Sequence, residues 1–246
     1  MRIGIIEAGH VNDALRARFG DYPSIFEALL RRADPALSFR TFRTVDGEVP
    51  QDPRACDAWL VTGSRHGVYD DLPWIGPLRA FLCAARDVDR PIVGICFGHQ
   101  ILAEAFGGRA IKSEKGWGVG VHEYEVLRRP GWMEAAPDRI ALHALHQDQV
   151  VEIPQDTAVL ASSPFCEFAI LAYGNPERPD AISVQAHPEY SVDFMRDLVT
   201  LRTGDVIPRE TGEAALRTLG RPVDSDQVAT WITAYLRKAE HPAHAD

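Results

Sequence analysis

The sequence is poor in cysteine, in long apolar runs and in positive charge, and each shortage excludes a class of protein. Only four cysteines occur among 246 residues. They show no CxxC or zinc-ligand spacing, which favours reduced thiols over a disulfide framework. No stretch approaches the roughly 20 apolar residues of a membrane span. The net charge of −9 argues against nucleic acid as the main partner. The composition therefore predicts a cytoplasmic globular protein with neither a membrane nor a nucleic-acid partner.

The most informative segment places a cysteine between a predicted strand and a predicted helix. Apolar residues 92–95 precede Cys96, and residues 101–106 have helical character. Gly94 and Gly98 flank the cysteine at minus two and plus two, the spacing of a nucleophile elbow, where a sharp turn leaves no room for a Cβ. The helix N-terminus favours the thiolate form. The segment predicts a nucleophile; the alternative is a buried cysteine at an ordinary strand–helix turn.

A second segment supplies the groups that such a cysteine needs. A predicted strand over residues 181–186 leads to His187, and Glu189 follows two positions on, with Pro188 restricting the backbone between them. A thiolate needs a base, and the imidazole needs a partner that fixes its tautomer. The 91 residues between Cys96 and His187 (187 − 96) are no obstacle, since triads assemble in space. Alone, this segment fits a surface turn; with the elbow it predicts a Cys-His-Glu triad.

At these two segments, 94–100 and 185–189, the chain resembles the class I glutamine amidotransferases of the Cys-His-Glu type. The resemblance implies a flavodoxin-like α/β domain that hydrolyses a γ-glutamyl amide through a thioester. It implies Cys96 as the nucleophile, His187 as general base and then acid, and Glu189 as the orienting carboxylate. No metal and no organic cofactor are required by this chemistry.

The resemblance covers residues 1–192, and it is most similar to stand-alone GMP-synthase-like members and to plant-type γ-glutamyl peptidases. The shared pieces lie at residues 61–64, 115–117 and 146–148, besides the elbow. The sequence departs from the family's better-known pattern because no synthetase domain follows. Residues 193–246 instead read as a short helical extension.

Strands and helices alternate early in the chain and strands dominate later, which predicts a mostly parallel sheet with an antiparallel part, flanked by helices. A helix is expected over 24–32 with Ser24 as its N-cap, and another over 73–86 opened by Pro73. In the extension, apolar side chains recur at helical spacing, which indicates either packing on the domain or a homodimer contact. Strands are expected at 2–7, 38–44, 58–62, 92–95, 119–127, 140–143, 158–162, 167–173 and 181–186, and extension helices at 193–202, 210–219 and 224–239.

The reaction also needs donors for the oxyanion that forms when a thiolate attacks an amide carbonyl. The N–H of Phe97, directly after the nucleophile, is one candidate by elbow geometry. The second is the N–H of Gly63, after the predicted strand 58–62, and the resemblance implies the same glycine. Ser64 beside it is expected to line the substrate pocket. The alternative is an ordinary turn at the end of the strand.

Further substrate contacts are expected from the helix after Cys96 and from a glycine-rich segment. Gln100 lies one helical turn past the nucleophile, and the resemblance places it against the substrate. Trp117 and Gly118 lie in a segment, residues 115–120, that suits a loop closing over a small ligand. The alternative is a glycine-rich hairpin with Trp117 in the core. His146 is not assigned a catalytic role.

Three functions remain open at this point. The first is a glutaminase-type amidotransferase, which releases ammonia from glutamine for a separate synthetase subunit. The second is a γ-glutamyl peptidase, acting on γ-glutamyl dipeptides or glutathione-like conjugates. The third is a binding or redox-sensing module in which Cys96 is an oxidisable thiol.

Overall fold

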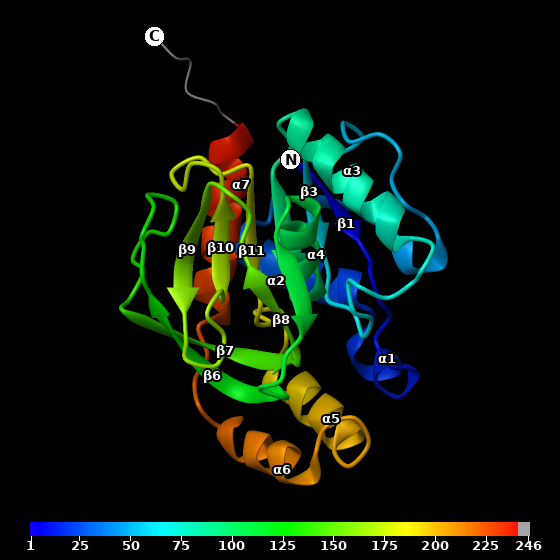
Figure 1. Cartoon of the computed structure of the whole chain (residues 1–246), viewed down its shortest axis with the longest axis vertical. Coiled ribbons are helices and arrows are strands. Elements are labelled where there is room, and N and C mark those ends of the chain that lie inside the picture. Colours follow the sequence, from blue (N-terminus) through cyan, green and yellow to red (C-terminus); the bar gives the residue numbers. More distant parts are fainter. Residues whose placement is uncertain (241–246) are drawn as a thin grey trace.

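Short apolar and β-branched runs pair into a central sheet, which has nine strands within residues 1–240, the described part of the chain. Figure 1 shows this computed structural model; residues 241–246, the end of the predicted extension, lie outside the described residues. The strands are β1 Arg2–Ile6, β2 Ser38–Phe42, β3 Ala58–Val61, β4 Ile92–Ile95, β6 Gly118–Val126, β7 Arg139–His146, β9 Thr157–Ser162, β10 Ile170–Tyr173 and β11 Ala181–Val184. A separate pair joins β5 Arg109–Lys112 to β8 Asp148–Glu152.

The strand order β2-β1-β3-β4-β11-β10-β9-β6-β7 divides the sheet into two parts. The first five strands run parallel to one another, and the remaining four are antiparallel. The parallel part follows the 2-1-3-4-5 order of flavodoxin-like folds, which bind ligands at the carboxyl ends of their strands. The predicted fold class, a mostly parallel sheet with an antiparallel part, is confirmed. The carboxyl ends of β4 and β11 are neighbours, because these two strands are paired.

Helices cover both faces of the sheet, because the buried parallel strands point alternate side chains to opposite sides. Ile5 and Leu60 belong to one core cluster and Ile6 and Val61 to the other. The first cluster packs under α2 and α7, and the second under α3 and α4. The helices are α1 Asp13–Phe19, α2 Tyr22–Ala33, α3 Ile75–Asp87, α4 Phe97–Ala105, α5 Val192–Arg202, α6 Arg209–Thr218 and α7 Ser225–Glu240, with a 3-10 turn at Thr44–Asp46.

Two predicted helix starts are wrong. Helix α2 begins at Tyr22 after Asp21, and the Ser24 hydroxyl donates to the Asp21 carbonyl instead of capping the helix. The first turn of a helix tolerates proline, so the helix starts upstream of the capping-box pattern. Helix α3 begins at Ile75, not at Pro73. The elements α1, β5 and β8 were not predicted.

The three helices of the extension lie at different places on the domain (Figure 1). Helix α7 packs on α2, α6 packs on β6, and α5 packs on α6. The Tyr235 hydroxyl on α7 accepts the Ile92 N–H at the start of β4 (3.2 Å). The domain boundary at residue 192, the homodimer contact and the cytoplasmic location stay predictions. Among the described residues, no helix combines the length and the apolar character that a membrane span requires.

Candidate active site

Cys96 stands at the sharp turn between β4 and α4, where the backbone is strained. Its φ of 54° and ψ of −101° are unfavourable for an L-residue. A Cβ on Gly94 would lie 2.3 Å from the Gly98 carbonyl oxygen, and a Cβ on Gly98 would lie 2.3 Å from the carbonyl oxygen of Val61. Both distances are impossible contacts, so only glycine fits at either position. The predicted elbow geometry is confirmed, and it turns Cys96 toward the carboxyl edge of the sheet.

His187 follows β11, the strand beside β4, and reaches the same edge. Its Nδ1–H donates to Glu189 Oε1 at 2.7 Å, and the Glu189 side chain is fully buried. Its ring stacks on Tyr190, with the centroids 4.0 Å apart and the planes 5° from parallel. The His187 N–H is held by the His143 carbonyl at 2.8 Å. These contacts fix both the tautomer and the orientation of the imidazole.

The imidazole of His187 also meets the thiol. The side chains of Cys96 and His187 interact, and a Cβ built on Gly63 would lie 3.1 Å from His187 Cε1 and 3.7 Å from Cys96 Cβ. Burial opposes a positive charge on His187, but the Glu189 carboxylate and Cys96 outweigh it and raise the pKa of His187 to about 10. At neutral pH the imidazolium form of His187 is therefore favoured.

The two proposed oxyanion donors lie on either side of the nucleophile. Phe97 is the first residue of α4, so its N–H has no intrahelical acceptor. Gly63 follows β3 and contacts the Cys96–His187 pair closely, as the distances from its Cβ position show. The arrangement brings both amides to the carboxyl edge of the sheet. It leaves their role as oxyanion donors a prediction.

The predicted substrate contacts lie in different surroundings. Ser64 follows Gly63 and accepts the His66 N–H on its hydroxyl (3.1 Å). The side-chain amide of Gln100 is buried and donates to the Asp148 carbonyl and to Gln185 Oε1, both at 3.1 Å. Gln100 therefore joins α4 to β8 and to the end of β11. Its substrate contact stays a prediction.

Gly118 is the first residue of β6, and Trp117 directly precedes it. Trp117 is half-buried against the core and lines a hollow of about 400 Å³ between β6 and α6, which Cys96 does not line. Gly118 pairs with His146 in the β6–β7 hairpin, and a Cβ there would meet the Phe165 ring at 2.3 Å. The structure has the glycine-rich hairpin, with Trp117 packed against the core. The contact of Trp117 and Gly118 with a substrate stays a prediction. Burial lowers the pKa of His146 to about 3, so this side chain is neutral.

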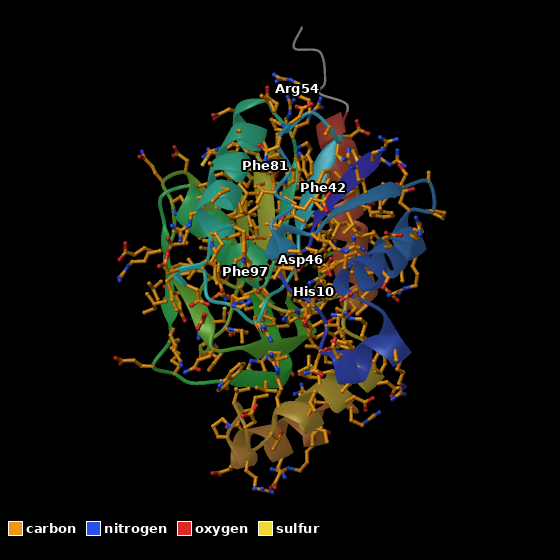
Figure 2. All side chains as sticks on the ribbon, turned by 90° about the vertical axis from the view of Figure 1, so that its right-hand side faces the viewer. His10, Phe42, Asp46, Arg54, Phe81 and Phe97 are labelled. Atoms are coloured by element: carbon orange, nitrogen blue, oxygen red, sulfur yellow. The ribbon has the colours of Figure 1, made fainter. Side chains whose placement is uncertain are left out.

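Sequence reasoning missed two features near the carboxyl edge. Tyr190 supports the His187 ring, and the only signal for it was its place directly after Glu189. His10, after β1, is hydrogen-bonded to Glu7 Oε1 (3.2 Å) and to Asp46 Oδ1 (2.9 Å), and Figure 2 shows His10 and Asp46 side by side. No spacing pattern links these residues, because they come from loops that meet only in the fold.

Among the side chains that the structure describes, those of residues 1–237, one group has metal-ligand atoms close enough to share an ion. Glu7, His10 and Asp21 have such atoms within 4.8 Å of one another. Both ring nitrogens of His10 are already hydrogen-bonded to carboxylates, and Asp21 accepts the Val11 N–H at 3.0 Å. The group therefore has internal partners for its donors and acceptors.

The geometry can be compared with known proteins. The family model for glutamine amidotransferase class-I matches residues 50–197, which include Cys96, His187 and Glu189. The chain belongs to this family. The chain is 29% identical over 188 residues to gamma-glutamyl peptidase 4 of Arabidopsis thaliana, a match that covers 74% of this chain and 72% of that protein.

Two further likenesses bear on fold and function. The chain is 36% identical over 142 residues to one subunit of the glutamine-hydrolyzing GMP synthase of Methanopyrus kandleri, covering 51% of this chain and 72% of that protein. The crystal structure of a glutamine amidotransferase from Thermotoga maritima superposes with a TM-score of 0.75 at 20% identity, covering 98% of this chain and 97% of the other. Because the identity is only 20%, this similarity shows a shared fold and says nothing about function.

Proposed function

We propose that this class-I glutamine amidotransferase hydrolyses a γ-glutamyl amide through a thioester on Cys96, with glutamine as its first substrate. The observation that carries the proposal is the contact of His187 with both Cys96 and Glu189, the latter at 2.7 Å, at the end of the strand beside the nucleophile. A base held between a thiol and a buried carboxylate is the arrangement of nucleophilic cysteine catalysis.

The reaction follows from these groups. The Cys96 thiolate attacks the γ-carbonyl carbon, and the N–H groups of Phe97 and Gly63 donate to the oxygen that gains the negative charge. His187, protonated, gives its proton to the departing nitrogen as the C–N bond breaks, which leaves a γ-glutamyl thioester. Water then attacks the thioester while His187 takes its proton, and the C–S bond breaks to release glutamate and restore the thiolate. Glu189 stabilises the imidazolium in both halves.

The choice of glutamine rests on access to the nucleophile. Cys96 is only 6% exposed and His187 only 2%, so a small leaving group such as ammonia suits the site better than a bulky amine. Ammonia released in this way would serve a separate synthetase subunit. The similarity to a protein named as one subunit of GMP synthase supports such a partner.

A γ-glutamyl peptidase is the second candidate, and the extent of the relationship favours it. The peptidase relative matches 74% of this chain, whereas the GMP synthase relative matches 51%. The chemistry at Cys96 is the same, since only the amine that leaves is different. No synthetase partner is needed in this case.

The deciding experiment measures glutamate release from L-glutamine and from a γ-glutamyl dipeptide side by side. Faster glutamate release from glutamine supports the first candidate, and faster release from the dipeptide supports the second. Cys96→Ala should abolish both activities while Cys83→Ala, which changes a part-buried cysteine of α3, should retain them. Retained activity in the Cys96 variant would overturn the nucleophile assignment. If neither substrate is hydrolysed and a glutamine-mimicking diazoketone does not label Cys96, the non-enzymatic alternative is favoured.

A further inference from the structure

The imidazole of His187 has one kind of partner at its edge and another on its face. At the edge, Nδ1–H donates to Glu189 Oε1 at 2.7 Å, and the Cys96 side chain also interacts with this imidazole. On the face lies the phenol ring of Tyr190, with the centroids 4.0 Å apart and the planes 5° from parallel. No water molecule fits between rings at this distance, and the two residues are only 2% and 4% exposed. The contact between the rings is therefore dry.

The Tyr190 ring is held against His187 by three further contacts. Its hydroxyl donates to the Tyr22 hydroxyl at 3.3 Å, and its ring packs on Phe194 with the centroids 4.6 Å apart. Its backbone carbonyl accepts the His143 Nδ1–H at 3.0 Å. Tyr190 is thus fixed at its hydroxyl, its ring and its main chain. Turning the ring away from His187 would break these contacts.

The titratable groups near His187 show that the ring acts without a charge of its own. In the described part of the chain, six side chains face His187 directly or through a neighbour: Glu189, Cys96, His143, His146, Tyr190 and Tyr22. Burial lowers the pKa of the two neighbouring histidines and raises the pKa of the two tyrosines, so these four groups are uncharged at neutral pH. A cation, Arg202, lies beyond Tyr22. Tyr190 therefore offers His187 a neutral π surface.

A neutral aromatic ring still distinguishes the two protonation states of an imidazole. Its face carries partial negative charge, so it attracts a cation that lies over it within about 6 Å, and more strongly where water is excluded. His187 lies over the Tyr190 ring within this range. The neutral imidazole gains less from the same contact because it has no net charge. The contact therefore stabilises the charged form relative to the neutral one.

We propose that the π face of Tyr190 stabilises the imidazolium form of His187 and so keeps on this ring the proton that the departing nitrogen takes. The inference rests on the proposed function, in which His187 gives that proton as the C–N bond breaks. Tyr190 is a positioning residue that acts through His187 and touches no reacting atom.

The test changes the charge distribution of the ring at position 190 while keeping its shape. Tyr190→Phe is compared with Tyr190→3,4,5-trifluorophenylalanine, because fluorine withdraws electrons from the face of the ring. The matched control places the same fluorinated residue at Phe194, whose ring packs on Tyr190. All chains also carry Cys96→Ala, so that no thiol titrates together with the imidazole. The measurement is the NMR titration midpoint of the His187 Cε1–H signal, identified by its absence from a His187→Gln chain.

The fluorinated chain should titrate about one pH unit below Tyr190→Phe, since the attraction of the imidazolium to the ring is lost. The control should titrate like the chain with an unaltered Phe194. Equal midpoints for the two chains at position 190 would overturn the proposal. Equal shifts at both positions would overturn it as well, because looser packing would then explain them. If the fluorinated chain does not fold, Tyr190→Leu, which has no π face, is compared with Phe194→Leu under the same expectation.

A second measurement, with Cys96 intact, separates this inference from the proposed function. The alkaline limb of kcat/KM for glutamate release should move to lower pH by the same amount as the midpoint, because a neutral His187 has no proton for the leaving nitrogen. An alkaline limb that stays in place would refute the role given to this proton. A shifted midpoint in a protein that hydrolyses no γ-glutamyl substrate would refute the proposed function and still support the effect of Tyr190 on His187.

Discussion

The strained backbone at Cys96 predicts that replacing this residue with glycine stabilises the protein relative to replacing it with alanine. An L-residue at φ 54° and ψ −101° costs about 1–3 kcal/mol. Glycine removes this cost, but it adds about 0.4–1 kcal/mol of conformational entropy to the unfolded chain. The net difference favours Cys96→Gly over Cys96→Ala by about 1 kcal/mol, taking values near the middle of each range. Both variants lack the thiol, so the comparison isolates the Cβ.

Urea unfolding measures this difference directly, as a shift of the midpoint at constant slope. In a thermal scan, about 1 kcal/mol corresponds to roughly 2–4 °C for a chain of this size. The control is Ala84→Gly in the middle of α3, where glycine should destabilise by about 1 kcal/mol because the backbone is helical. If Cys96→Gly is less stable than Cys96→Ala, as at the control position, the backbone at the elbow is not strained and the reasoning fails.

Three further predictions concern the same edge of the sheet. Gly98→Ala should destabilise by about 3 kcal/mol or more, because its Cβ would lie 2.3 Å from the Val61 carbonyl oxygen; a urea midpoint equal to that of the unaltered protein would contradict this. Glu189→Gln should lower kcat by roughly 10²- to 10⁴-fold with an unchanged circular dichroism spectrum, because the imidazolium loses its carboxylate; steady-state kinetics on the better substrate measure it. Burial opposes a charge on His10, but Asp46 and Glu7 raise its pKa above 6.5. Asp46→Asn should therefore cost about 0.5 kcal/mol below pH 6.5 and nothing once the pH has risen above the raised pKa; unfolding curves with equal losses at both pH values would argue against the pairing.

The candidate catalytic groups could be proposed from the sequence because most of their constraints are local. Gly94 is fixed by its contact with Gly98 within one turn, and Glu189 lies two residues from the histidine to which it is bonded. Gly98 itself is fixed by Val61 of the neighbouring strand, a contact that the elbow spacing indicates only indirectly. The alternation of strands and helices along the chain predicted the mostly parallel sheet.

The substrate contacts and the supporting clusters depend on segments that meet only in the folded chain. Gln100 was expected to face the substrate, yet its amide nitrogen is bonded to Asp148 and Gln185, which lie 48 and 85 residues further along. The His10–Asp46 contact joins two loops after different strands. The start of β4 and the residue before β11 likewise meet α7 only in the folded chain, through the Tyr235 hydroxyl. Periodicity and motif spacing do not indicate which distant segments come into contact in the fold.

The position of β11 between β4 and β10 delays completion of the sheet in the nascent chain. The strand that leads to His187 is made 91 residues (187 − 96) after the cysteine, which at 5–20 residues per second takes roughly 5–20 s on the ribosome. Tyr235, which holds the start of β4, emerges later still. Until then the thiol has neither its base nor a completed sheet around it. Synthesis order alone therefore leaves the proposed nucleophile without its base until His187 has been made.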